Sequence, residues 1–208
     1  MTKPKRTTAA ELLAKLEQDP VWVEQRRQRE EKRRLEEEED AREEAPVVQE
    51  LRAAGAQVSS VWDLVNTRAS YPELLPLLVD QLQRPYPDGV REGIARALAV
   101  PEATFAWPLL VRLYRQEPAG QVKNALALAV GNAADAKELE ELIALTRDSQ
   151  LGESRMLLLF GLDRSRDPRA LRALRELATD PDLKKEIRFI LRCRERKQRR
   201  QRARKMTN

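Results

Sequence analysis

The sequence predicts an all-α fold: an α-α superhelix, or solenoid, of about four stacked helical hairpins with a long charged helix at its N-terminal side. The first observation is a repeat, because apolar residues recur every 32 residues without gaps. The second is composition, since charged residues make up 35% of the chain and aromatic residues 4%, which is typical of long solvated helices. The third is that no stretch shows the alternating apolar and polar pattern of a β-strand.

The repeat consists of columns that keep one class of residue. Aliphatic or aromatic columns hold Leu75, Trp107, Leu139 and Leu171, then Leu78, Leu110, Leu142 and Leu174, and also Ile94, Leu126, Leu158 and Ile190. One column holds only small residues, namely Ala97, Ala129, Gly161 and Cys193. Because a single hairpin cannot bury its own apolar face, the fixed period predicts that neighbouring hairpins stack. The small-residue column predicts a close approach between helices.

The expected helices follow from this register. Each hairpin has a first and a second helix. The first helices are predicted at 72–83, 103–116, 135–147 and 167–179, and the second helices at 87–99, 120–132, 151–164 and from 182 onward. Pro76 and Pro108 lie inside two first helices, and each should kink its helix or shift its start, because proline lacks a backbone N–H and clashes with the previous turn. Trp107 occupies an aliphatic column, so we expect it in the core.

Five segments are predicted along the chain. They are an amphipathic hook (1–19), a charged helical spacer with i, i+4 ion pairs (20–45), capping helices (46–70), the repeat domain (71–194) and a basic C-terminal tail (195–208). Pro46 is expected to begin a separate helix, and Trp62 is expected to pack over the exposed end of the first repeat. Terminal repeats need such caps.

The second helices open with a recurrent step. It reads Val90-Arg91 and Val122-Lys123, then Ser154-Arg155, and the fourth unit departs from it with Glu186-Ile187. Over roughly residues 71 to 194 these columns resemble HEAT repeats of the short bacterial, phycobilisome-lyase-like kind. The resemblance implies a scaffold that binds other proteins. Bilin lyase activity is not expected, because no pigment-handling set of residues is evident.

Catalytic chemistry has little support in the sequence. The chain has no histidine and one cysteine, which removes the commonest general base and excludes a standard zinc site. The glycines form no phosphate-cradling cluster. Some HEAT-like proteins are DNA glycosylases with Asp, Trp and Arg on a basic face, but Asp88 and Asp163 fit turn or surface positions better here. We therefore predict no enzyme activity, cofactor, metal or small-molecule substrate.

The expected location is the cytoplasm. Cys193 can form no intramolecular disulfide, which fits a reducing compartment. No segment approaches the roughly 20 apolar residues of a membrane span, and the N-terminus lacks the apolar stretch of a signal peptide.

Basic residues provide the candidate binding sites. Arg91, Lys123 and Arg155 recur at one angular position, and two interpretations stay open: internal ion pairs with residues such as Asp88, Glu117 or Asp148, or a stripe that binds an acidic partner or a phosphate backbone. The C-terminal segment adds a dense basic run. The candidate partner-binding residues are Arg91, Lys123, Arg155, Arg188, Arg192, Arg196 and Arg199.

Two functional hypotheses follow from these features. The first is a cytoplasmic, non-catalytic scaffold or adaptor that binds a protein partner. The second is a nucleic-acid-associated protein that uses the basic repeat face and the tail, with binding driven by the phosphate backbone.

Overall fold

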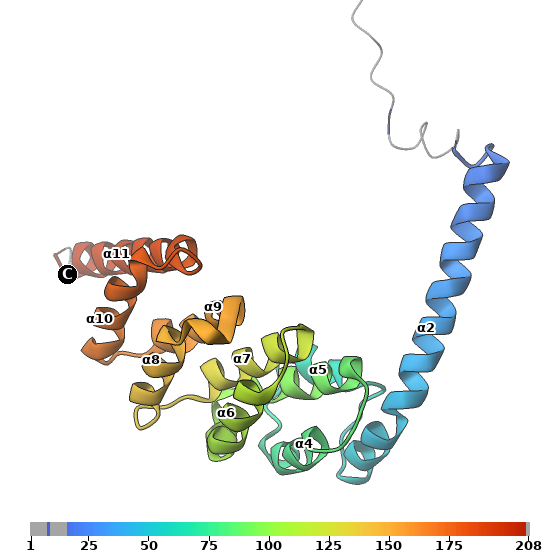
Figure 1. Ribbon diagram of the computed structural model, residues 1–208, viewed down its shortest axis with the longest axis horizontal. Helices are drawn as coiled ribbons and strands as arrows, with labels where there is room; N and C mark the ends of the chain where they lie inside the picture. The colour runs from blue at the N-terminus through green and yellow to red at the C-terminus, as the bar shows by residue number, and fades with distance from the viewer. Residues whose placement is uncertain (1–7, 9–15, 207–208) are drawn as a thin grey trace, which may run out of the picture. The chain divides into compact units, whose positions relative to one another are not determined.

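The protein is all-helical, as predicted. The computed structural model describes residue 8 and residues 16–206, and no strand occurs among them (Figure 1). The chain divides into two compact units, Met1–Ala45 and Pro46–Asn208. Most of the predicted hook at 1–19 lies outside the described residues.

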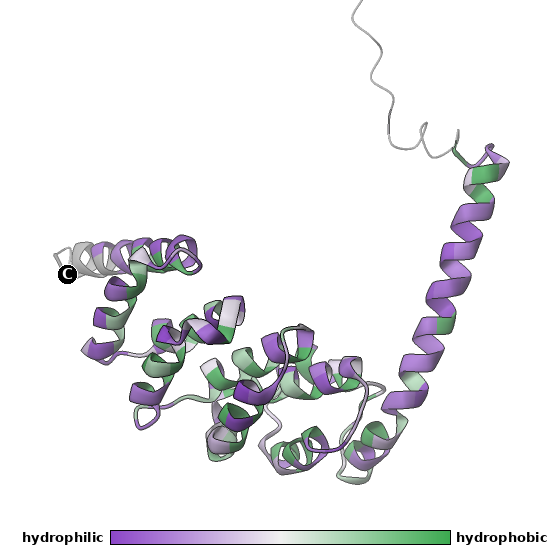
Figure 2. Cartoon of the chain, viewed as in Figure 1, coloured by the Kyte–Doolittle hydropathy of each residue, from purple (hydrophilic) through white to green (hydrophobic). Residues whose placement is uncertain are grey.

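Helix α2 (Pro20–Ala53) contains the predicted charged spacer. Figure 2 shows that its spacer portion is mostly hydrophilic. Four of the predicted i, i+4 ion pairs form, namely Arg26–Glu30, Lys32–Glu36, Arg33–Glu37 and Arg34–Glu38. All of these side chains are exposed, so each pair contributes only a few tenths of a kcal/mol.

The prediction of a separate helix from Pro46 is wrong, because α2 continues through this proline to Ala53. A proline in a helix costs one backbone hydrogen bond and crowds the previous turn. The strong helix formers Glu43-Glu44-Ala45 precede it, and Val47 and Val48, which directly follow it, are buried, so packing holds the helix together past the proline. The junction between the two compact units nevertheless falls at this residue.

The last turns of α2 and the short helix α3 (Trp62–Asn66) join the core of the second unit. Val47, Leu51 and Val61 are fully buried there. Trp62 is partly exposed; its indole lies beside Gly93, and the Arg96 guanidinium lies over the ring at 5.9 Å from its centroid. The segment predicted to cap the first repeat therefore packs on the second helix of that repeat.

Four consecutive helix pairs follow. Pair 1 is α4 (Leu75–Leu82) and α5 (Asp88–Ala97), pair 2 is α6 (Trp107–Gln116) and α7 (Gln121–Ala133), pair 3 is α8 (Leu139–Arg147) and α9 (Arg155–Arg164), and pair 4 is α10 (Pro168–Glu176) and α11 (Lys184–Met206). In Figure 1 the first helices follow one side of this unit and the second helices the other. Successive second helices are in contact from α5 to α11.

The prolines act as predicted at two helix starts. Pro76 and Pro108 stand in the first turns of α4 and α6, where a missing N–H has no intrahelical partner to lose. Short 3-10 segments, Pro72–Leu74 and Pro101–Ala106, precede the two helices. Both prolines therefore shift the helix start, and neither lies in a helix interior.

The predicted apolar columns form one continuous core. Of the twelve residues, eleven are buried, including Trp107, and only Leu171 in the last pair is half-buried. Among the described residues no further helix pair packs against this last one, and its first helix keeps more solvent contact. Helix α11 runs without a break through the position where the repeat domain was expected to give way to a tail.

Among the described residues, no single helix has the length and apolar character that a membrane crossing requires. One pair of segments, Asp88–Ala97 and Pro101–Gln116, meets that test of length and composition only when taken together, and the two are bent by 115° relative to each other.

Candidate partner-binding surface

Arg91 lies near the start of α5 and points toward the next helix pair. Its two terminal nitrogens donate to both carboxylate oxygens of Glu117, at 2.9 Å and 2.5 Å, and one of them lies 3.5 Å from Asp88 Oδ1. The hydrogen bond with Glu117 raises the pKa of Arg91 above its ordinary value. A bidentate pair of this kind fixes both side chains and joins pair 1 to pair 2.

Lys123, 32 residues later on α7, is buried. Its Nζ donates to the backbone oxygen of Glu117 at 2.9 Å and lies 5.5 Å from the centre of the Tyr114 ring. Asp148, one of the carboxylates considered as partners for these cations, instead accepts a hydrogen bond from the backbone N–H of Gln150. The lysine thus holds the turn between α6 and α7 within its own pair.

Arg155, at the start of α9, is only 1% exposed. Its guanidinium donates to Asp180 at 2.9 Å and to Asp182 at 3.0 Å, and also to the backbone oxygens of Gly152 and Thr146. Burial alone would raise the pKa of Asp180, but the hydrogen bond from Arg155 and backbone N–H groups outweigh it and lower that pKa. This guanidinium connects pair 3 to the turn of pair 4.

These three cations are therefore structural. Their charged groups are engaged inside the protein and do not face a partner: Arg91 and Arg155 form internal ion pairs, as that interpretation expected, whereas Lys123 binds a backbone oxygen and no carboxylate. Ile187 occupies the corresponding position in α11 and is fully buried. Among the described residues no later turn supplies a carboxylate there, and an apolar side chain fills the position.

Helix α11 carries the remaining candidates on its outward side. Arg188, Arg192, Arg196 and Arg199 recur at helical spacing, so they share one face, and all four are exposed. Among the described residues none of them pairs with a carboxylate; Arg192 Nε donates to the backbone oxygen of Arg188 at 3.2 Å. Among the side chains of this helix that the structure describes, the exposed charged residues are six cations and one acid: Lys185, Arg188, Arg192, Arg196, Lys197, Arg199 and Glu195.

Large apolar side chains are exposed on the neighbouring second helices. Met156 (42%) and Phe160 (52%) lie on α9, and Phe189 (55%) lies on α11. Met156 and Phe160 hold the register positions of Arg188 and Arg192, 32 residues earlier, and α9 contacts α11. The preceding helix, α7, carries Asn124 and half-buried Leu128 in the same register. We call this surface the second-helix face: Asn124, Leu128, Met156, Phe160, Arg188, Phe189 and Arg192.

Sequence reasoning missed two other arginines that cap helix ends. Arg164 donates to the backbone oxygens of Asn132 and Ala134 at the end of α7. Arg194 donates to Leu162 O at 2.8 Å and to Asp163 Oδ1 at 2.7 Å at the end of α9. Cations at a helix C-terminus satisfy its last carbonyls. The two arginines belong to different columns, so the repeat gave no signal for them.

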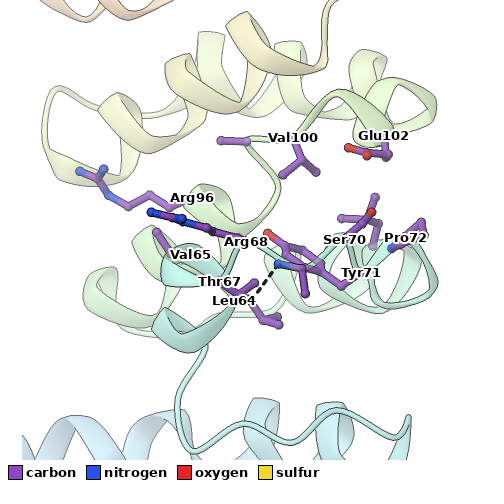
Figure 3. A pocket seen from close by; sticks show the side chains of 13 residues that line it. Leu64, Val65, Thr67, Arg68, Ser70, Tyr71, Pro72, Arg96, Val100 and Glu102 are labelled. Atoms are coloured by element: carbon purple, nitrogen blue, oxygen red, sulfur yellow. Dashed lines mark hydrogen bonds between the residues drawn. The ribbon is translucent and has the colours of Figure 1, made fainter.

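A cleft of about 280 Å³ lies between α3, the loop after it and the end of α5. Figure 3 shows Arg68 and Arg96 on one side of it and Glu102 on the opposite rim. The Tyr71 hydroxyl donates to Ala97 O at 2.9 Å, and Arg96 is paired with Glu92 at 2.8 Å. Both signs of charge line this cleft, so it has no strong preference for one class of ligand.

Comparison with family models, curated proteins and solved structures gives no significant match in any of the three.

Proposed function

We propose that this chain is a HEAT-like solenoid that acts as a non-catalytic scaffold and binds a protein partner through its second-helix face. The single observation that carries the proposal is the exposure of Met156, Phe160 and Phe189 on two adjacent helices. Aromatic residues, methionine and arginine are enriched at protein interfaces, and adjacent exposed apolar side chains mark interaction sites.

The repeat supports the proposed architecture. Helix pairs recur at the interval of the sequence columns, their second helices contact one another in order, and the core runs through all four pairs. The internal ion pairs of Arg91 and Arg155 also support this architecture, because each joins two consecutive helix pairs. Rigid stacked helices suit a scaffold, because they present a fixed surface to a partner.

An affinity capture from the native cell extract tests the proposal. The full chain is compared with Phe160→Ser and with Phe105→Ser, which removes a similarly exposed phenylalanine from the segment before α6. We expect the wild type and Phe105→Ser to retain the same protein after nuclease treatment and Phe160→Ser to lose it. Equal capture by all three would show that this face is not the binding site.

Nucleic-acid binding through α11 is a second candidate, favoured by the six exposed cations of that helix. They could neutralise several phosphates, and affinity would then fall steeply with salt, with a slope of roughly 0.7 to 0.9 per contact on a log-log plot. Removing residues 195–208 should then weaken binding, because Arg196, Lys197 and Arg199 are lost while Lys185, Arg188 and Arg192 remain. The scaffold proposal expects only weak binding, lost near physiological ionic strength.

A further inference from the structure

We propose that the partner's docking element is an acidic amphipathic helix, which sets its apolar side chains against Met156 and Phe160 and its carboxylates against Arg188 and Arg192. This inference rests on the proposed function and gives the partner a chemistry.

The cations of the face are available to a partner. Arg91 and Arg155 use their charges inside the protein: Arg91 forms an ion pair with Glu117, and Arg155 forms ion pairs with Asp180 and Asp182. The outward arginines of α11 have no such carboxylates among the described residues, although the same helix places Arg194 on Asp163. Helix α11, which supplies Arg188 and Arg192 to the face, has six exposed cations and a single exposed acid among its described side chains, so it is complementary to a negatively charged partner.

The apolar part of the second-helix face requires apolar side chains on the partner in addition to negative charge. Met156 and Phe160 lie one turn apart on α9, and Phe189 lies beside the cationic stripe of α11. Burying two or three such side chains gives a partner its anchors, whereas exposed ion pairs alone contribute little. The partner must therefore offer apolar side chains next to carboxylates.

A helix meets these requirements better than an extended peptide. An extended segment binds by adding a strand to a sheet edge, and the described residues contain no sheet. On a helical surface the partner's backbone N–H and C=O groups must be satisfied within the partner itself, which a helix does. Apolar residues at i, i+3, i+4 and i+7 then face α9, and acidic residues on the flank face α11.

The same face is poorly suited to single-stranded nucleic acid. Binders of that class combine stacking platforms with a basic groove that follows the backbone over several nucleotides. Here the second-helix face takes half-buried Asn124 and Leu128 from α7 and exposed Met156 and Phe160 from α9, none of which is cationic. Within this face positive charge comes from α11 alone, so no basic track passes along Met156 and Phe160.

The test measures binding of the full chain to synthetic peptides by fluorescence anisotropy at physiological salt. The acidic probe is an amphipathic peptide of about 20 residues, roughly 30 Å long as a helix, with leucines on one face and glutamates on its flanks. The second probe replaces every glutamate with lysine, and the third is an oligo-deoxythymidine of similar length. We expect the acidic peptide to bind at least about tenfold more tightly than either of the other probes.

Variants locate the binding site. The double variant Arg188→Glu, Arg192→Glu should weaken binding of the acidic peptide by about fivefold or more. The single variant Phe160→Ser should weaken it by a similar factor. The matched controls, Arg172→Glu with Arg175→Glu on α10 and Phe105→Ser, make the same changes at exposed positions outside the face and should leave affinity unchanged. Far-ultraviolet circular dichroism confirms that each variant is folded.

Three outcomes would overturn the inference: equal binding of acidic and basic peptides, equal effects of the face variants and their controls, or preferred binding of the oligonucleotide. The first two leave the proposed function intact if cell-extract capture still depends on Phe160, because the partner then has another chemistry. If capture from the cell extract does not depend on Phe160, the proposed function itself is wrong.

Discussion

Gly161 on α9 packs against Gly131 on α7 so closely that a Cβ atom at position 161 would overlap the carbonyl oxygen of Gly131. The same atom would lie 2.7 Å from Leu142 Cδ2, and a Cβ at Gly131 would lie 2.9 Å from Leu157 O. Two helices at this separation leave no space for a methyl group. This contact is the closest approach that the glycines reveal between pairs 2 and 3.

Gly161→Ala should therefore destabilise the protein by about 1–3 kcal/mol, because the methyl group meets backbone, which cannot move aside without shifting a helix. Thermal or urea denaturation measures the change. Gly89→Ala is the control, since nothing lies within 4 Å of a Cβ at that exposed helical site. It should be neutral or stabilise the protein by up to about 1 kcal/mol. Equal behaviour of the two variants would contradict the close approach.

Leu126 lies at the centre of the second-helix column and is fully buried. Leu126→Ala should lower the free energy of unfolding by about 2–5 kcal/mol, through lost burial and the cavity left behind. Gln121→Ala, at the exposed first residue of the same helix, should change it by less than about 0.5 kcal/mol. A Leu126→Ala protein as stable as the wild type would show that this column is not core.

Arg155 should be costly to remove, because its guanidinium satisfies two carboxylates and two backbone oxygens. Arg155→Met should destabilise the protein by on the order of 3 kcal/mol, as for other buried pairs that lose one partner. Adding Asp180→Asn to Arg155→Met should cost less than Asp180→Asn costs in the wild type. Strict additivity in this double-mutant cycle would argue against the pairing.

The lowered pKa of Asp180 predicts a pH dependence of stability. The ionised carboxylate stabilises the folded state fully above its ordinary pKa of about 3.9, and this stabilisation disappears as pH falls through the lower folded value. The difference in unfolding free energy between wild type and Asp180→Asn should thus be constant at neutral pH and shrink below about pH 4. Urea denaturation along a pH series measures it. A difference that grows on acidification would have the wrong sign.

The sequence predicted the helices of the repeat well, because its periodicity reports burial directly. Boundaries set by Pro76 and Pro108 were also predictable, since proline acts locally. Pro46 was misjudged because the burial of Val47 and Val48 holds the helix together past the proline, and this packing is not visible in the local sequence. Leu171 was misjudged because a column does not tell which of its members stays partly exposed to solvent.

The candidate site was less predictable. Arg91, Lys123 and Arg155 recur at one angular position, but periodicity cannot tell whether a recurrent cation faces solvent or a carboxylate in the next turn. Glu117, the partner of Arg91, was among the acids that the internal-pair interpretation named, whereas Asp180 and Asp182, the partners of Arg155, were not. The exposure of Phe160 and Phe189 was not predicted either, since it depends on which helix face the neighbours leave uncovered.

The junctions between helix pairs are chemically unequal. Arg91 joins pairs 1 and 2 and Arg155 joins pairs 3 and 4 by ion pairs that are shielded from solvent, whereas pairs 2 and 3 meet in the contact of Gly131 with Gly161 and in one exposed ion pair, Arg115–Glu141. Acid protonates the carboxylates of the two shielded ion pairs, but it leaves the close backbone contact of the middle junction unchanged. Because repeat arrays open locally at their weakest interfaces, the terminal pairs should exchange their amide hydrogens first under acid, while α7 and α9 stay protected as the last cooperative unit.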